Sequence, residues 1–195
     1  MHSKTHDMIL IALFASLTAI GAFIRLDTPL VPFTLQFTFC AYAGLILGAK
    51  KGALSQTIYV TIGLIGFPVF TRGGGPSYIF EPTFGYLIGF IFCAYLIGWM
   101  TETMKSFKDR RSIMRITLAV AGGLGVLYLI GMFYLYFVMN TLIGTPMSLS
   151  GAFVGGVLPF IAGDFITGAV VVLTSIKILP VIREGTHFKS HPVNE

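Results

Sequence analysis

One carboxylate lies deep in an apolar part of the chain, where it is suited to binding a polar ligand. Asp164 is the only acidic residue between Asp109 and Glu184. Burying a carboxylate in a membrane is costly, so an intramembrane acid indicates a functional role by default. Pro159 can end one helical segment and open another, which would expose backbone donors to a ligand. We predict that an ionised Asp164 accepts two N–H donors from a small ligand. A packing role, paired with Arg72 or a backbone donor, is the alternative.

A stretch rich in glycine, proline and aromatic residues, 66–90, lies between two apolar runs. Non-helical backbone beside a bilayer persists only where protein or a wet cavity satisfies its polar groups. We therefore expect this stretch to fold back as the lid and part of the wall of a small-molecule site. Its rings and hydroxyl groups suit a pocket, and we predict that the ligand contacts Phe70, Tyr78, Phe80 and Tyr86. An aromatic belt at the membrane interface is the alternative.

Three further polar residues are candidates for ligand binding. Arg72 and Glu81 flank the triple glycine at 73–75. We predict that Arg72 holds a ligand carboxylate and that Glu81 positions Arg72, the alternative being two solvated loop charges. Gln36 lies near the end of the second apolar run, where its amide would bond a ligand amide or cap the connecting loop.

The composition indicates an integral membrane protein. The chain has 195 residues, of which 55% are hydrophobic and 11% charged, whereas a soluble domain carries about 25% charged residues. A membrane-spanning helix needs roughly 20 apolar residues. We therefore predict an all-α protein, a single domain of six transmembrane helices over residues 1–195, with spans at about 8–24, 33–49, 52–67, 82–103, 116–139 and 150–179. The last span is interrupted at Pro159 and at Gly163-Asp164.

The basic residues predict the orientation of these spans. Eleven of the 13 Lys and Arg residues fall at the termini and in alternate connections, whereas only Arg25 and Arg72 fall in the others. Because cytoplasmic loops carry the excess of basic residues, both termini are predicted to be cytoplasmic and the 66–90 stretch to face outside. The net charge of +5 clusters between the spans, so it does not indicate nucleic-acid binding.

Several classes of function lack their residues. No GxxxxGK[ST] phosphate-binding motif is present, so any uphill transport would draw its energy from another chain. The four histidines lie near the ends of the chain, and no cysteine or histidine cluster indicates a metal. Beyond Asp164, no carboxylate, histidine or lysine falls inside a predicted span, apart from Glu102 and Lys177 near the ends of theirs. An intramembrane enzyme would need such paired groups.

Four motifs in order along the chain resemble the BioY family, the biotin-specific substrate-binding (S) components of energy-coupling factor (ECF) transporters. The resemblance covers nearly the whole chain. The motifs are Pro-Phe-Thr-Leu-Gln at 32–36, Gly-Phe-Pro-Val-Phe at 66–70 with the triple glycine at 73–75, Pro-Thr-Phe-Gly-Tyr-Leu-Ile-Gly-Phe at 82–90, and Leu-Pro-Phe-Ile-Ala-Gly-Asp at 158–164.

This resemblance implies an S-component bundle of six helices in a prokaryotic cell membrane, with no catalytic activity and no cofactor of its own. The chain would be the high-affinity biotin-binding subunit of an ATP-driven vitamin importer. Its partners would be biotin, the lipid bilayer, a transmembrane coupling protein and a pair of ATPases. Ala15 and Ala19 match the small-residue stripe with which the family docks the coupling protein. Transport would proceed by toppling of the S component in the membrane.

The resemblance also adds to the expected ligand set. Thr83 lies in the matching 82–90 motif, and Thr167 stands where the family often has a lysine. Residues 81–86 read Glu-Pro-Thr-Phe-Gly-Tyr where the family often has Gly-Pro-Thr-Gly-Gly-Tyr, and Arg72 replaces a small residue. We predict that Arg72 takes the place of the missing lysine at the ligand carboxylate. An S component for another small vitamin, an enzyme acting on a lipid headgroup and a purely structural membrane partner are the alternatives.

Overall fold

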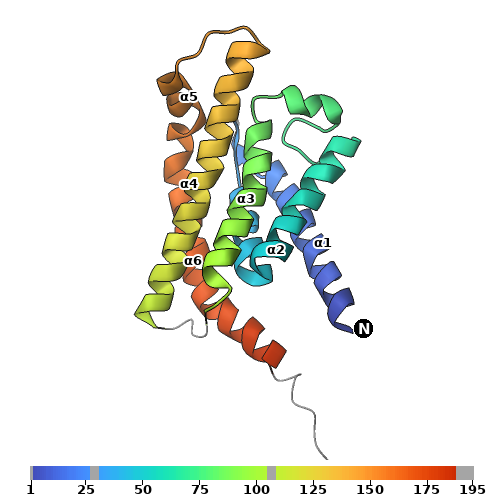
Figure 1. Cartoon of the computed structure of the whole chain (residues 1–195), viewed down its shortest axis with the longest axis vertical. Helices are drawn as coiled ribbons and strands as arrows, with labels where there is room; N and C mark the ends of the chain where they lie inside the picture. Colours follow the sequence, from blue (N-terminus) through green and yellow to red (C-terminus); the bar gives the residue numbers. More distant parts are fainter. Residues whose placement is uncertain (1, 27–30, 105–108, 188–195) are drawn as a thin grey trace, which may run out of the picture.

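The computed structural model describes residues 2–26, 31–104 and 109–187. Within them the chain forms six α-helices, one 3₁₀ helix and one short hairpin (Figure 1). The elements are α1 (His2–Phe23), β1 (Arg25–Leu26), β2 (Phe33–Thr34), α2 (Gln36–Ile65), η1 (Pro76–Phe80), α3 (Phe84–Thr101), α4 (Arg110–Thr141), α5 (Leu149–Gly156) and α6 (Leu158–His187). Lys105, Lys108 and Lys189, on which the predicted orientation partly rests, lie outside the described residues.

Four of these helices are long and apolar enough to cross a membrane, namely Lys4–Phe23, Phe84–Thr101, Arg110–Thr141 and Leu158–Ile182. The helices also expose many large apolar side chains on their outer faces, among them Phe23, Phe92, Phe137, Phe165 and Leu173. An outer surface this apolar is suited to lipid. The predicted all-α membrane class is therefore confirmed.

Helix α2 contains a sharp reversal at Gly48, which separates the predicted spans 33–49 and 52–67. Gly48 has φ of +80°, a conformation that side chains disfavour and glycine adopts freely. The two halves then pack closely, since a Cβ atom at Gly52 would lie 3.0 Å from the Ala43 carbonyl oxygen. Figure 1 shows α2 turning at the lower end of the molecule. The chain of α2 thus runs through the bundle twice, once before and once after Gly48.

The last predicted span, 150–179, is divided differently from the prediction. The break falls at Val157, between α5 and α6, and Pro159 lies in the first turn of α6, where the missing proline N–H has no partner to lose. The predicted interruption at Gly163-Asp164 is wrong, because both residues lie inside α6. Asp164 is therefore held on a continuous helix, about two turns beyond the break at Val157.

The start of α2 also differs from the prediction. Residues 33 and 34 form β2, which pairs antiparallel with β1 in the register Arg25 to Thr34 and Leu26 to Phe33. The helix therefore begins at Gln36 instead of near 33. This short hairpin places β2 against α1 and α6, and residues 31–36 thereby reach a cavity inside the bundle.

Candidate functional site

The main cavity lies between the helices, beneath the loop at 66–81. This loop, which includes η1, forms the lid of the cavity. The hollow holds about 530 Å³ of space free of atoms, including its open mouth. Its walls come from the 31–37 segment, the lid loop with η1, α3, α4 and α6. The lining residues are Val31, Pro32, Phe33, Thr34, Gln36, Phe37, Thr71, Tyr78, Thr83, Tyr86, Leu87, Phe90, Leu127, Tyr128, Phe160 and Asp164. Apolar and aromatic walls with few polar groups are typical of small-ligand sites.

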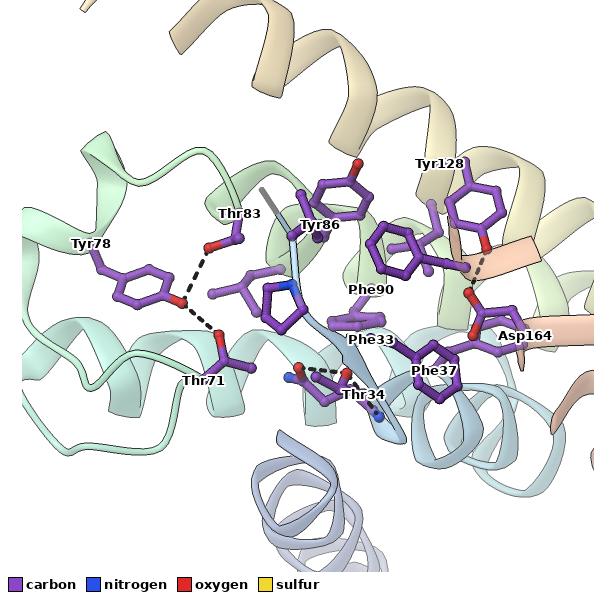
Figure 2. Close-up of a pocket in the computed structure, with 16 residues that line it drawn as sticks. Phe33, Thr34, Phe37, Thr71, Tyr78, Thr83, Tyr86, Phe90, Tyr128 and Asp164 are labelled. Atoms are coloured by element: carbon purple, nitrogen blue, oxygen red, sulfur yellow. Dashed lines mark hydrogen bonds between the residues drawn. The ribbon is translucent and has the colours of Figure 1, made fainter. Parts of the chain in front are cut away.

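Asp164 and Tyr128 form the polar end of the cavity (Figure 2). The Tyr128 hydroxyl on α4 donates a hydrogen bond to Asp164 Oδ2 on α6, with an oxygen-to-oxygen distance of 2.5 Å. Asp164 is only 6% exposed. Among the described residues, none donates to Oδ1. An ionised carboxylate is an acceptor only, so Oδ1 and the remaining lone pair of Oδ2 can receive N–H donors from a ligand.

The lid carries a second polar cluster at the opposite end of the cavity (Figure 2). The Thr83 hydroxyl donates to Tyr78 Oη over 3.2 Å, and the Thr71 and Tyr78 hydroxyls lie 3.0 Å apart. These bonds tie residue 71 in the loop to η1 and to the entry of α3. The lid is thus closed over the cavity by its own hydroxyl groups.

Gln36 connects the first loop to the lid. Its Nε2 donates to Tyr59 Oη over 2.7 Å, and the Tyr59 hydroxyl donates to the Val69 carbonyl over 3.1 Å. The Thr34 hydroxyl donates to Gln36 Oε1 over 3.1 Å. The amide thus lines the cavity and, through Tyr59, also anchors residue 69 of the lid.

Tyr86 lines the cavity, but its hydroxyl is committed to the fold. This hydroxyl donates to the Gly156 carbonyl over 2.6 Å, at the break between α5 and α6. The ring lies against Gly131, where an added Cβ atom would approach within 2.4 Å. Tyr86 therefore offers a ligand the face of its ring.

We expect Tyr86→Phe to destabilise the protein by about 1 kcal/mol, the usual net contribution of one hydrogen bond. Ligand affinity should stay within about twofold of wild type, because the ring remains. Thermal unfolding in detergent and equilibrium ligand binding measure the two effects. A large loss of affinity with unchanged stability would instead place the hydroxyl on the ligand.

Four of the residues predicted to contact a ligand do not line the cavity. Phe70 is buried behind Tyr78, with ring centroids 4.5 Å apart, and it packs on Gly63 as an anchor for the lid. Phe80 is 62% exposed. Arg72 pairs with Glu81 over 3.5 Å, and its side chain is 44% exposed. The Thr167 hydroxyl donates to the Asp164 carbonyl over 3.2 Å, so Thr167 supports the helix turn beside the carboxylate.

Ala15 and Ala19 lie in a separate shallow groove between α1 and the second half of α2. The groove holds about 490 Å³ and is also lined by Ile58, Ile62 and Val69. Ala15 is buried and Ala19 partly buried against the core. The stripe thus packs inside the molecule and also forms the floor of an outer groove.

Several residues of the cavity could not be predicted from the sequence. The Tyr128 hydroxyl donates a hydrogen bond to Asp164, yet Tyr128 is one of three tyrosines in the uncharged, glycine-rich part of α4 at 116–141. A hydroxyl in so apolar a helix was the available signal. Phe33, Phe37 and Thr71 also line the cavity. Phe33 belongs to the motif at 32–36, but only the fold shows that its ring faces the cavity.

The chain matches the model of the BioY family over residues 1–184. A protein of Lysinibacillus sphaericus named a probable biotin transporter BioY is 40% identical over 186 residues, covering 95% of this chain and 93% of that protein. The biotin transporter BioY of Thermotoga maritima is 34% identical, covering 88% and 95%.

One solved structure has a similar fold. The crystal structure of an S-component for biotin from an ECF-type ABC transporter aligns with a TM-score of 0.79 at 24% identity, covering 92% of this chain and 93% of that chain. At this identity the similarity concerns the fold. It agrees with the S-component bundle that the sequence predicts.

Proposed function

This chain belongs to the BioY family, and from that premise we propose that it binds biotin as the substrate-binding subunit of an ECF-type importer. The observation that carries the proposal is the buried Asp164 carboxylate in an aromatic cavity, with one oxygen held by Tyr128 and the other unpartnered among the described residues. Relatives that span almost the whole chain are named as biotin transporters, which argues against an enzyme acting on a lipid headgroup and against a purely structural membrane partner.

The ureido ring of biotin complements this cavity. It presents two N–H donors and one carbonyl acceptor, and Asp164 would accept from the N–H groups. The Gln36 amide has one N–H left after its bond to Tyr59, and that donor would serve the ureido carbonyl. The rings of Phe33, Phe90 and Tyr86 would enclose the bicyclic system. Burying it contributes about 25 cal/mol per Å² of apolar area, while the polar groups select the ligand.

Competition binding tests the proposal. The full chain, purified in detergent and stripped of ligand, is titrated with labelled biotin, with desthiobiotin and lipoate as competitors. Desthiobiotin keeps the ureido ring and should compete, whereas lipoate keeps only a carboxylated tail and should not. We expect a Kd near the nanomolar level, which is about −12 kcal/mol. Saturable binding of lipoate but not of desthiobiotin would point to another ligand.

The carboxylate end of the ligand tests the role of Arg72. Because the Arg72 guanidinium lies outside the cavity and faces Glu81, we expect Arg72→Ala to lower biotin affinity by no more than about threefold, as exposed ion pairs contribute little. Binding of biotin and of uncharged biotin amide measures this. A tenfold loss for biotin alone would place Arg72 on the carboxylate, as the sequence predicts.

We further propose that the importer contains a transmembrane coupling protein and two ATPases, in a prokaryotic cell membrane with both termini cytoplasmic. The absence of a phosphate-binding motif from this chain supports separate ATPases, and the distribution of basic residues supports the orientation. The groove at Ala15 and Ala19 is the proposed contact of the coupling protein, since small residues let helices approach closely.

A bulky residue in this groove should separate transport from binding. We expect Ala19→Trp to retain biotin binding but to reduce ATP-dependent biotin uptake about tenfold or more, because an indole would occupy the space of a packed helix. Ile20→Trp is the matched control, since Ile20 is exposed and lies outside the groove. Equal uptake by the two variants would contradict docking at this groove.

A further inference from the structure

A second hollow lies at the lower end of the molecule, far along α3 and α4 from the ligand cavity. It is lined by Trp99 and Met100 near the end of α3, Thr103 just beyond it, and Arg115 in the second turn of α4. It holds about 660 Å³ of space free of atoms, open to the outside. None of these residues belongs to the biotin site or to the groove at Ala15.

The Arg115 guanidinium is fixed in this hollow by two hydrogen bonds. Nε donates to the Met100 carbonyl, and Nη2 donates to Thr103 Oγ1 over 2.8 Å. A guanidinium has five N–H donors in a planar fork. These two contacts leave three of the donors without a partner among the described residues, and Arg115 lines the open hollow. A planar fork of this kind matches the oxygens of a phosphate.

The charges around the hollow favour an anion. None of its lining residues carries a carboxylate. The nearby Glu102 points toward the Gly48 turn, because its Oε1 lies 3.4 Å from where a Cβ atom of Gly48 would be. Asp109 accepts hydrogen bonds from Ser112 at the start of α4. Arg110 and Arg111, both exposed, add positive charge to the same end of α4.

The apolar part of the hollow indicates that the anion belongs to a lipid. Trp99 is the single tryptophan of the chain, and it lies at the end of a spanning helix. Its side chain is 61% exposed. Tryptophan at such a position sits at the level of the lipid headgroups. Exposed apolar residues continue from it along the outer faces of α3 and α4, namely Phe92, Tyr95, Met114 and Leu118. A soluble anion would gain nothing from this surface.

We propose that the hollow of Trp99, Met100, Thr103 and Arg115 binds the phosphate of an anionic phospholipid. The phosphate accepts hydrogen bonds from Arg115, the indole of Trp99 packs at the glycerol level, and the acyl chains follow the apolar faces of α3 and α4. Basic pockets between spanning helices bind anionic headgroups in this manner. The lipid would brace α3 against α4 at the end opposite the ligand cavity.

Fluorescence of Trp99 tests this, because no other tryptophan contributes. The full chain is reconstituted in phosphatidylcholine vesicles that contain a minor fraction of bromine-labelled lipid, which quenches indole on contact. We expect brominated phosphatidylglycerol to quench at about fivefold lower mole fraction than brominated phosphatidylcholine. High salt should reduce this difference less than it would for a purely exposed charge. Equal quenching by the two lipids would overturn the proposal.

Variants and a soluble competitor locate the site. Arg115→Gln should remove the preference for phosphatidylglycerol, whereas Lys177→Gln, which removes an exposed basic residue of α6 outside the hollow, should retain it. Biotin binding by both variants verifies that they fold. Arg115→Lys keeps the charge but loses the planar guanidinium fork, so it should retain part of the preference for phosphatidylglycerol. Preference unchanged in Arg115→Gln, or abolished by glycerol phosphate at the same concentration as the lipid, would contradict a lipid site at Arg115.

Discussion

Asp164→Asn is expected to weaken biotin binding about 100-fold, which corresponds to about 2.7 kcal/mol. A hydrogen bond to a charged group contributes about 1.5–3 kcal/mol. The asparagine amide keeps one acceptor oxygen but loses the charge and turns an N–H₂ group toward ligand donors or toward the Tyr128 hydroxyl. Equilibrium binding of labelled biotin to the purified variant measures the loss.

Glu81→Gln is the matched control for this prediction. It makes the same chemical change at another carboxylate, but the Glu81 side chain is partly exposed and lies outside the cavity. Biotin affinity should therefore change by less than about twofold, as for other exposed ion pairs. If the two variants bound biotin equally well, Asp164 would have only a packing role.

The largest effect on stability is expected at the contact between α2 and α3. At Gly98, an added Cβ atom would lie 2.3 Å from the Ala49 nitrogen and 2.4 Å from the Gly48 carbonyl carbon. Both atoms are backbone, so the helices must separate to accept even one methyl group. We expect Gly98→Ala to destabilise the protein by about 1–3 kcal/mol, the usual cost of overpacking. The midpoint of thermal unfolding in detergent reports it.

Gly125→Ala supplies the control for the helical glycine itself. Gly125 lies in α4, and nothing stands within 4 Å of its added Cβ atom. Alanine in a helix is more favourable than glycine by about 0.5–1 kcal/mol, so this variant should be as stable as wild type or slightly more stable. Destabilisation by both substitutions to the same extent would refute the close contact at Gly98.

The membrane class and the place of Asp164 in the cavity could be predicted because they depend on residue type. A carboxylate that stands alone in a long apolar region must be satisfied by something, whatever the fold. The break near Pro159 could be predicted for the same reason, since proline ends a hydrogen-bonded ladder. Tyr128, the hydrogen-bond partner of Asp164, could not be predicted. It lies 36 residues away on another helix, and nothing in its local sequence specifies that pairing.

The lid shows a different limit. Phe70 and Tyr78 are both aromatic residues of one loop, and composition cannot distinguish a ring that faces the cavity from one that anchors the loop. The difference arises from Gly63, whose missing side chain makes room for the Phe70 ring. Likewise, β1 and β2 are only two residues each, too short for a pattern, so the later start of α2 follows from pairing that only the folded chain reveals.

The proposal that Asp164 accepts the ureido N–H groups of biotin is tested most directly by changing the ligand and the protein together. Biotin and biotin methylated at both ureido nitrogens are each titrated against wild type and Asp164→Asn. The steric cost of the methyl groups is common to both proteins, so the difference between the two affinity losses isolates the N–H contacts with Asp164. We predict that methylation weakens binding to wild type at least about tenfold more than binding to the variant, since bonds to a charged group are being lost. Equal losses in the two proteins would show that Asp164 does not receive the ureido N–H groups.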